Sequence, residues 1–327
     1  MPLIRRTLLG LLSILLFVSS PLLATDPAPG VKPSDRILVL GDSNTYAGGY
    51  VTLLETWLTI HQPEADWTIV NLGLPSETAS GESEPAHPFP RPCVHERLTR
   101  ALEKFQPTVV TLAYGMNDGI YYPPSKERLA SYQSGITKAY EQCQKAGARV
   151  YLLTPPMFDA LPLRASGKLK PAGEKEYAWF APYENYDDAL GEFADWIQTQ
   201  GPQVAGIVNT RTPIVSYVQE QRKTKPEFTM AGDGIHFDAT GHEIVARKVW
   251  KAWHLSPADP VAADADARRA AVIKPLVEKK QKLLLHAWLS HVGHQRPGIE
   301  AGLPLAEAEQ QSAAIQVEIR LVLAGVK

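Results

Sequence analysis

Cysteine is scarce in this chain of 327 residues, which contains only Cys93 and Cys143. Neither a Cys-x-x-Cys nor a His-x-x-x-His spacing occurs, so the common arrangements of structural zinc ligands are missing. The two cysteines permit one disulfide in an oxidising compartment, but two separate thiols are equally compatible with the sequence. The fold must therefore depend on an ordinary hydrophobic core and not on a framework of disulfides or metals.

Long blocks of like charge are also missing. The formal net charge is −2 and the isoelectric point is about 6.5. These values give no support for nucleic acid or another polyanion as a partner. Hydrophobic residues make up 44% of the chain and charged residues 21%, which is an ordinary globular composition with enough apolar side chains for a large core.

One prominent hydrophobic run lies at the N-terminus. Arg5 and Arg6 precede an apolar stretch at 8–18, small or flexible residues follow it, and Leu22-Leu23-Ala24 could end at a cleavage site. A basic start, a short apolar segment and a small final residue are typical of a signal peptide, which we predict to span residues 1–24. The run is too short for a comfortable membrane span, and an uncleaved anchor is the alternative. We expect an exported protein, periplasmic or secreted, without stable membrane insertion after cleavage.

Beyond residue 35, short apolar runs alternate with amphipathic stretches. Runs suited to strands buried on both faces occur at 36–41, 67–73, 107–115 and 149–154, with a weaker candidate at 204–208. Helical patterns occur between and after them, at 50–60, 96–105, 125–146, 186–199 and 241–253. This alternation predicts an α/β fold, a doubly wound three-layer sandwich around a parallel sheet of five strands.

The sequence divides into four segments. A linker with several prolines follows the predicted signal peptide at 25–35, and the sheet domain follows at 36–255. The composition changes after residue 255, where 275–288 and 305–323 have helical patterns. We therefore expect residues 256–327 to form a helical C-terminal extension, whose role the sequence does not reveal.

Residues that can carry chemistry follow three of the predicted strands. Ser43 stands in Gly41-Asp42-Ser43-Asn44, Gly73 ends the second run, and Asn117 stands in Gly115-Met116-Asn117-Asp118. Because the carboxyl ends of parallel strands meet at one edge of a sheet, we expect these residues to lie together. Ser43 offers a hydroxyl nucleophile, Gly73 lets a ligand approach the backbone, and Asn117 can donate a hydrogen bond to an oxyanion.

A fourth element, Asp233-Gly234-Ile235-His236, supplies what a serine nucleophile needs. A hydroxyl is a weak nucleophile until a base accepts its proton, and an imidazole suits that task near neutral pH. Asp233 can fix the tautomer and the orientation of the His236 ring. Each element alone has an ordinary structural explanation, as a helix cap, a turn or a loop ion pair. In this order and combination they predict a catalytic triad of Ser43, His236 and Asp233.

This set of four blocks resembles the SGNH, or GDSL-type, hydrolase family over about residues 35–255. The resemblance implies a flavodoxin-like sandwich with strand order 2-1-3-4-5. It also implies an oxyanion hole formed by the Ser43 amide, the Gly73 amide and the Asn117 side chain. The sequence departs from the family pattern in two places, because Asn44 replaces leucine and the stretch 72–76 lacks a second glycine. The helical extension is not part of the family core.

Other residues near these blocks have simpler explanations. His242 is a rival base, but it lies in a predicted helix and is expected to contact that helix or the core. Asp42 and Asp118 are expected to make structural hydrogen bonds. The histidines of the extension lack regular metal-ligand spacing; they are His286, His291 and His294. An aromatic-rich stretch at 177–186 either walls a sugar or acyl pocket or forms a packed lid.

The sequence therefore predicts a serine esterase that needs no metal or organic cofactor. His236 would accept the Ser43 proton as the serine attacks an ester carbonyl, and Asp233 would stabilise the imidazolium. Export and the aromatic stretch favour an acylated, above all acetylated, polysaccharide as the substrate. The alternatives are a lipid or short-chain acyl esterase, an acyltransferase, and a non-catalytic carbohydrate-binding protein on the same fold.

Overall fold

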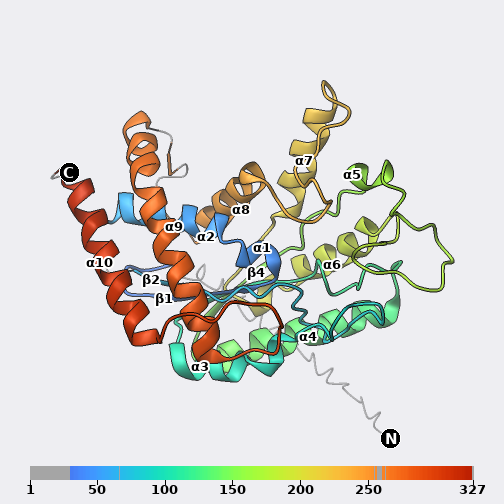
Figure 1. Cartoon of the computed structure of the whole chain (residues 1–327), viewed down its shortest axis with the longest axis horizontal. Coiled ribbons are helices and arrows are strands. Elements are labelled where there is room, and N and C mark those ends of the chain that lie inside the picture. Colours follow the sequence, from blue (N-terminus) through green and yellow to red (C-terminus); the bar gives the residue numbers. More distant parts are fainter. Residues whose placement is uncertain (1–29, 66, 254, 256–259, 262, 326–327) are drawn as a thin grey trace, which may run out of the picture.

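The computed structural model describes residues 30–325 except 66, 254, 256–259 and 262 (Figure 1). The predicted signal peptide lies outside the described residues. A parallel five-stranded sheet has the order β2-β1-β3-β4-β5, which confirms both the predicted fold class and the predicted strand order. The strands are β1 Arg36–Gly41, β2 Thr68–Asn71, β3 Val109–Ala113, β4 Arg149–Leu153 and β5 Gly206–Val208.

The strands are apolar along almost their whole length because both faces of the sheet are covered by other elements. Ile37 and Leu38 are neighbours on β1 and point to opposite faces, yet both are fully buried. Leu38 pairs with Val70 of β2 and with Val110 of β3. These three side chains belong to one apolar core, whereas Ile37 belongs to the other. The sheet therefore separates two cores, as a three-layer sandwich requires.

Helices of the sheet domain cover both faces of the sheet. One face packs against α3 Leu98–Phe105, α4 Lys126–Lys145 and α6 Asp187–Thr199. The other packs against α2 Gly49–His61, α7 Arg211–Arg222 and α8 Ala239–Ala252. Two single-turn helices, α1 Ser43–Tyr46 and α5 Leu161–Arg164, lie in loops. Helix α7 has no counterpart among the predicted helices, because only Ile214 and Val218 of it are buried and its apolar stripe is narrow.

The C-terminal extension is a pair of helices, α9 Asp264–Val292 and α10 Leu305–Leu323, which lie side by side next to β2 (Figure 1). The extension is helical as predicted, but α9 begins at Asp264 and continues through Pro275. Proline deprives the carbonyl four residues earlier of its partner. Here both Pro275 and Ala271 are exposed, so water can replace the lost bond. Within the described part of the chain, no helix is long and apolar enough to cross a bilayer.

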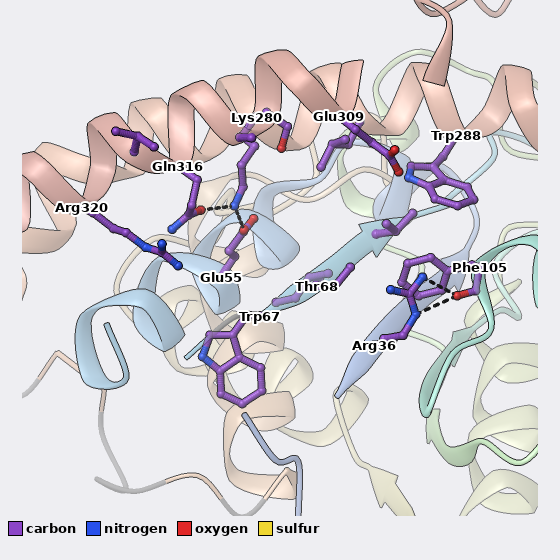
Figure 2. Close-up of a pocket in the computed structure, with 16 residues that line it drawn as sticks. Arg36, Glu55, Trp67, Thr68, Phe105, Lys280, Trp288, Glu309, Gln316 and Arg320 are labelled. Atoms are coloured by element: carbon purple, nitrogen blue, oxygen red, sulfur yellow. Dashed lines mark hydrogen bonds and ion pairs between the residues drawn. The ribbon is translucent and has the colours of Figure 1, made fainter. Parts of the chain in front are cut away.

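Polar contacts dock α9 on the open edge of the sheet. Gln281 donates from Nε2 to the carbonyl of Ile69 on β2 at 3.1 Å, which satisfies one group of an edge strand that would otherwise lack a partner. Lys280 forms a buried ion pair with Glu55 of α2 and donates to Gln316 Oε1 on α10 at 2.5 Å. Figure 2 shows Lys280 between these two partners, above β2. The extension is thus attached through specific groups as well as apolar packing.

The two cysteines are separate free thiols. Cys143 is buried on α4, and burial raises the pKa of its thiol to about 12. Cys93 is partly exposed, and burial raises its pKa as well. Both groups are therefore protonated near neutral pH, and of the two arrangements that the sequence left open, the structure has the one without a disulfide.

Candidate active site

Ser43, His236 and Asp233 come together beyond the C-terminal end of β1. His236 Nε2 lies 2.8 Å from Ser43 Oγ, and His236 Nδ1 lies 2.6 Å from Asp233 Oδ2. The second oxygen of Asp233 accepts hydrogen bonds from the amides of Ile235 and His236 at 2.9 and 2.8 Å. One carboxylate therefore closes the 233–236 turn and also orients the imidazole. The structure brings together the three residues that the sequence singled out.

Asn44 joins the serine to the histidine loop, a role that the sequence did not reveal. Its Nδ2 donates to the carbonyl of Ile235 at 3.1 Å, and its Oδ1 accepts from the amide of Phe237 at 3.2 Å. The two bonds hold the backbone on both sides of His236 against the start of α1. The sequence signal for this role was that Asn44 replaces the leucine of the family pattern, because only a polar side chain can make these contacts.

The local charges suit a base at His236. Partial burial opposes ionisation of Asp233, but hydrogen bonds from His236 and Ile235 outweigh it and hold the pKa of the carboxyl well below its ordinary value. The hydrogen bond to Asp233 raises the pKa of His236, although burial acts in the opposite direction. The pair therefore consists of an ionised carboxylate and an imidazole that accepts a proton more readily than a free histidine.

Asn117 is held with its amide nitrogen as the available donor. Its Oδ1 accepts from Arg91 Nη1 at 3.0 Å and from the Tyr121 hydroxyl at 3.2 Å. Both partners are donors here, so this bonding fixes which end of the amide is oxygen. Nδ2 donates to the carbonyl of Glu77 at 3.1 Å. An amide nitrogen carries two hydrogens, which leaves a second one for a bound oxyanion.

Gly73 has a different local role from the one that the resemblance implies. Its amide donates to Asn71 Oδ1 at 2.8 Å, and a Cβ at this position would lie 2.3 Å from the backbone nitrogen of Tyr46. Glycine is therefore required for close packing of this loop against α1. Gly73 is not among the residues that line the pocket at Ser43, and its part in an oxyanion hole stays a prediction.

Ser76 is another residue of this loop whose backbone amide is available as a donor. It lines the same pocket as Ser43 and Asn117, and its φ of 69° lies in the left-handed region that glycine usually occupies. Among the described residues none accepts a hydrogen bond from the Ser76 amide. Ser76 was not among the predicted site residues. The sequence signal for it is that 72–76 lacks a second glycine, so a residue other than glycine takes this conformation.

A buried ion pair supports this wall of the pocket. Arg91 donates from Nε and Nη2 to the two oxygens of Glu84 at 2.6 and 2.7 Å, and both side chains are almost fully buried. The same guanidinium donates from Nη1 to the Ser76 carbonyl at 3.3 Å as well as to Asn117. Arg91 thus fixes both candidate oxyanion residues relative to one rigid carboxylate.

The pocket at Ser43 has a volume of about 220 Å³. Its walls combine the triad and oxyanion residues with aromatic, proline and cationic side chains: Ser43, Pro75, Ser76, His87, Pro88, Phe89, Arg91, Asn117, Tyr121, Trp179, Ile235, His236 and Arg296. The aromatic stretch at 177–186 has one ring in the pocket wall and others packed in the interior. Trp179 lines the pocket and is 46% exposed, whereas Tyr177 and Tyr186 are buried.

The remaining candidates near the site behave as expected from the sequence. Asp42 caps α1 by accepting from the Asn44 amide at 3.0 Å, and burial raises its pKa to about 7. Asp118 accepts from the amides of Ala79 and Ser80, both at 2.8 Å. His242 is buried, and burial lowers its pKa to about 4. It stacks on Tyr50 within the core, away from the Ser43 hydroxyl that His236 contacts.

Comparison with known proteins agrees with this geometry. Residues 39–244 match the GDSL-like Lipase/Acylhydrolase family. The chain belongs to this family. The matched region contains all four sequence blocks and excludes α9 and α10. The protein is therefore an esterase of the GDSL type, also called SGNH, as the sequence blocks implied.

Solved structures share the fold at low sequence identity. A gut microbial diltiazem-metabolizing enzyme is 24% identical with a TM-score of 0.52; the match covers 69% of this chain but only 49% of that one. An alpha/beta hydrolase enzyme from the metagenome of Lake Arreo, Spain, is 19% identical with a TM-score of 0.50, over 68% and 95% of the two chains. An acetylxylan esterase from Geobacillus stearothermophilus is 17% identical with a TM-score of 0.50, over 71% and 98%. No curated protein sequence matched the chain.

Proposed function

We propose that the protein is a serine esterase in which Ser43 is the nucleophile, His236 the base and Asp233 the orienting carboxylate, and that it removes short acyl groups from an extracytoplasmic carbohydrate. The observation that carries the first part is the continuous contact from Asp233 through His236 to Ser43, at 2.6 and 2.8 Å. In this arrangement the imidazole is placed to accept the hydroxyl proton in the step that makes the serine nucleophilic.

The proposed mechanism has two acyl-transfer steps. Ser43 Oγ attacks the ester carbonyl while its proton moves to His236 Nε2, and Asp233 stabilises the imidazolium. The tetrahedral oxyanion accepts hydrogen bonds from the Ser43 amide, Asn117 Nδ2 and the Ser76 amide, which we prefer to the Gly73 amide because the latter is already bonded to Asn71. His236 gives the proton to the leaving alcohol, which leaves an acyl-enzyme. Water then gives a proton to His236 and attacks the acyl carbonyl, and His236 returns that proton to Ser43 as the acid is released.

Pocket size and surface support a short acyl group on a sugar. A volume of about 220 Å³ is smaller than the usual pocket for a drug-sized ligand and leaves little room for a long acyl chain. Trp179 and Phe89 supply the aromatic surface on which sugar rings commonly pack. The acetylxylan esterase among the structural neighbours is consistent with this substrate class. The signal peptide predicted from the sequence supports a substrate outside the cytoplasm.

Hydrolysis by the purified protein tests the proposal. We would measure release of acetate from acetylated xylooligosaccharides and release of nitrophenol from p-nitrophenyl acetate, butyrate and longer esters. The Ser43→Ala variant is the matched control, because it removes the nucleophile and little volume. We expect hydrolysis that requires Ser43, with acetyl esters preferred over long-chain esters.

The outcomes distinguish the alternatives. Preference for long acyl chains would contradict the carbohydrate proposal and favour a lipid esterase. Acyl transfer to an added alcohol in preference to water would identify a transferase. Hydrolysis that survives in Ser43→Ala would overturn the proposed triad, and binding of acetylated sugars without turnover would favour the non-catalytic alternative.

A further inference from the structure

The C-terminal extension contributes a side chain to the catalytic pocket. The loop 293–304 connects α9 to α10, and Arg296 of this loop lines the pocket together with Ser43 and His236. Neither the loop nor Arg296 lies in the segment that matches the family. The extension, whose role the sequence left open, therefore takes part in shaping the substrate site.

The loop that carries Arg296 is held in place by α3 of the sheet domain and by α9. Arg100 of α3 donates to the carbonyls of Val292 and Gly293 at 2.8 and 3.1 Å. At the other end of the loop, the Gly302 amide donates to Ser290 Oγ at 2.8 Å, and a Cβ on Gly302 would lie 2.2 Å from backbone atoms of α9. These contacts fix the loop on α3 and α9, so Arg296 occupies a defined position at the pocket.

Arg296 lies against an aromatic ring and lacks an acidic partner. Its guanidinium carbon is 4.8 Å from the centre of the Phe89 ring, and its Nη1 donates to the carbonyl of Pro297. Its Nε is buried without a hydrogen-bond partner. In the described part of the chain no carboxylate forms an ion pair with it, and its partial burial lowers the pKa of the guanidinium without neutralising it.

Two guanidinium groups line the pocket. Its lining includes Arg91 and Arg296 and no aspartate or glutamate. Arg91 forms an ion pair with Glu84 behind the wall at 2.6 Å, and Asp233 is bonded to His236. Among the described residues, Arg296 is therefore the guanidinium of the lining that has no carboxylate partner. A cation that lines the same pocket as the reacting serine favours a substrate that brings a negative charge.

We propose that Arg296 binds an anionic group on the substrate, and that the esters cleaved at Ser43 are acyl esters of acidic sugars. The inference rests on the proposed function. The anionic group is a carboxylate, as in a uronic acid, or a sulfate, since a planar guanidinium binds the oxygens of both. The sugar ring packs on the aromatic surface of Phe89 and Trp179, and the anion reaches Arg296 while the ester lies at Ser43.

Hydrolysis by the full chain tests the preference for charge. The substrates are an acetylated methyl glucuronoside, an acetylated methyl glucoside and its 6-sulfate. The variants are Arg296→Gln, Arg296→Lys and Arg268→Gln, the last removing an exposed charge from the far end of α9. We expect the wild type to favour a charged ester, and Arg296→Gln to reduce the ratio of charged to neutral kcat/KM by roughly 10- to 100-fold, mainly through KM. Arg296→Lys should retain part of the preference, and Arg268→Gln all of it.

Equilibrium binding separates this inference from the proposed esterase activity. In a Ser43→Ala background, calorimetry with methyl glucuronoside, methyl glucoside 6-sulfate and methyl glucoside needs no turnover. We expect a charged sugar to bind more tightly than the neutral one, and we expect this difference to disappear in Ser43→Ala/Arg296→Gln. The charged sugar that binds more tightly identifies the anionic group as a carboxylate or a sulfate. Equal binding of charged and neutral sugars, or a charge preference that survives in the double variant, would overturn the role of Arg296. Absence of ester turnover with this preference intact would contradict the proposed function alone.

Discussion

Replacement of Asn117 by alanine is the sharpest probe of how the site would stabilise an oxyanion. The substitution removes Nδ2, the donor whose second hydrogen is free after the bond to Glu77 at 3.1 Å. Loss of one oxyanion donor typically costs about 2.7–4 kcal/mol in transition-state stabilisation, or roughly 10²–10³ in kcat. Because the donor acts mainly on the charge that develops in the transition state, KM should change little.

The same substitution has a separate effect on stability. Arg91 keeps its bonds to Glu84 and Ser76, but the buried Tyr121 hydroxyl loses its acceptor at 3.2 Å. An unsatisfied buried group costs about 1–3 kcal/mol, so urea denaturation should detect a modest loss in the free energy of unfolding.

The assay for Asn117→Ala is steady-state hydrolysis of p-nitrophenyl acetate under conditions where the variant is fully folded. Tyr121→Phe is the matched control, because it removes one bond to Asn117 Oδ1 but keeps Nδ2, and its loss of kcat should be much smaller. A folded Asn117→Ala variant with the kcat of the wild type would refute the assignment of Asn117 as an oxyanion donor.

Two further predictions concern the base and the extension. Asp233→Asn removes the hydrogen bond that raises the pKa of His236. Because the neutral imidazole is the base, the acid limb of the pH profile of kcat/KM should move to lower pH. The plateau of kcat/KM should fall by roughly 10⁴-fold. An unshifted limb would contradict this cause of the raised pKa. Lys280→Met leaves Glu55 buried without its cation, which should lower the free energy of unfolding by about 3–5 kcal/mol in urea denaturation. The exposed Lys279→Met is its control, and equal stability of the two variants would show that the ion pair does not matter for docking α9.

The sequence was sufficient for the sheet and the triad because both depend on local signals. Apolar runs of strand length mark β1 to β4, and their carboxyl ends carry Ser43, Gly73 and Asn117 in the order that a doubly wound sheet brings together. Asp233 and His236 are three residues apart, so a single turn is enough to place them. The observed contacts of this triad match the predicted ones.

The sequence was insufficient where the chemistry depends on contacts between distant segments. Asn44 acts on Ile235 and Phe237, which lie almost two hundred residues away, and no periodicity reports such a pair. Ser76 is recognisable only by its backbone conformation. Arg296 reaches the pocket because α9 packs on α2 and β2 and brings its following loop back to the sheet edge. Packing of this kind is a property of the tertiary structure.

The most direct test of the central claim is to trap the acyl-enzyme. Rapid acid quenching during hydrolysis of p-nitrophenyl acetate, followed by peptide mass mapping, should find one acetyl group on Ser43 in the wild type. The adduct should be missing from Ser43→Ala and should form far more slowly in His236→Ala, which lacks the base for both acyl-transfer steps. Acetylation of another residue, or full turnover without any acyl adduct on Ser43, would contradict the account.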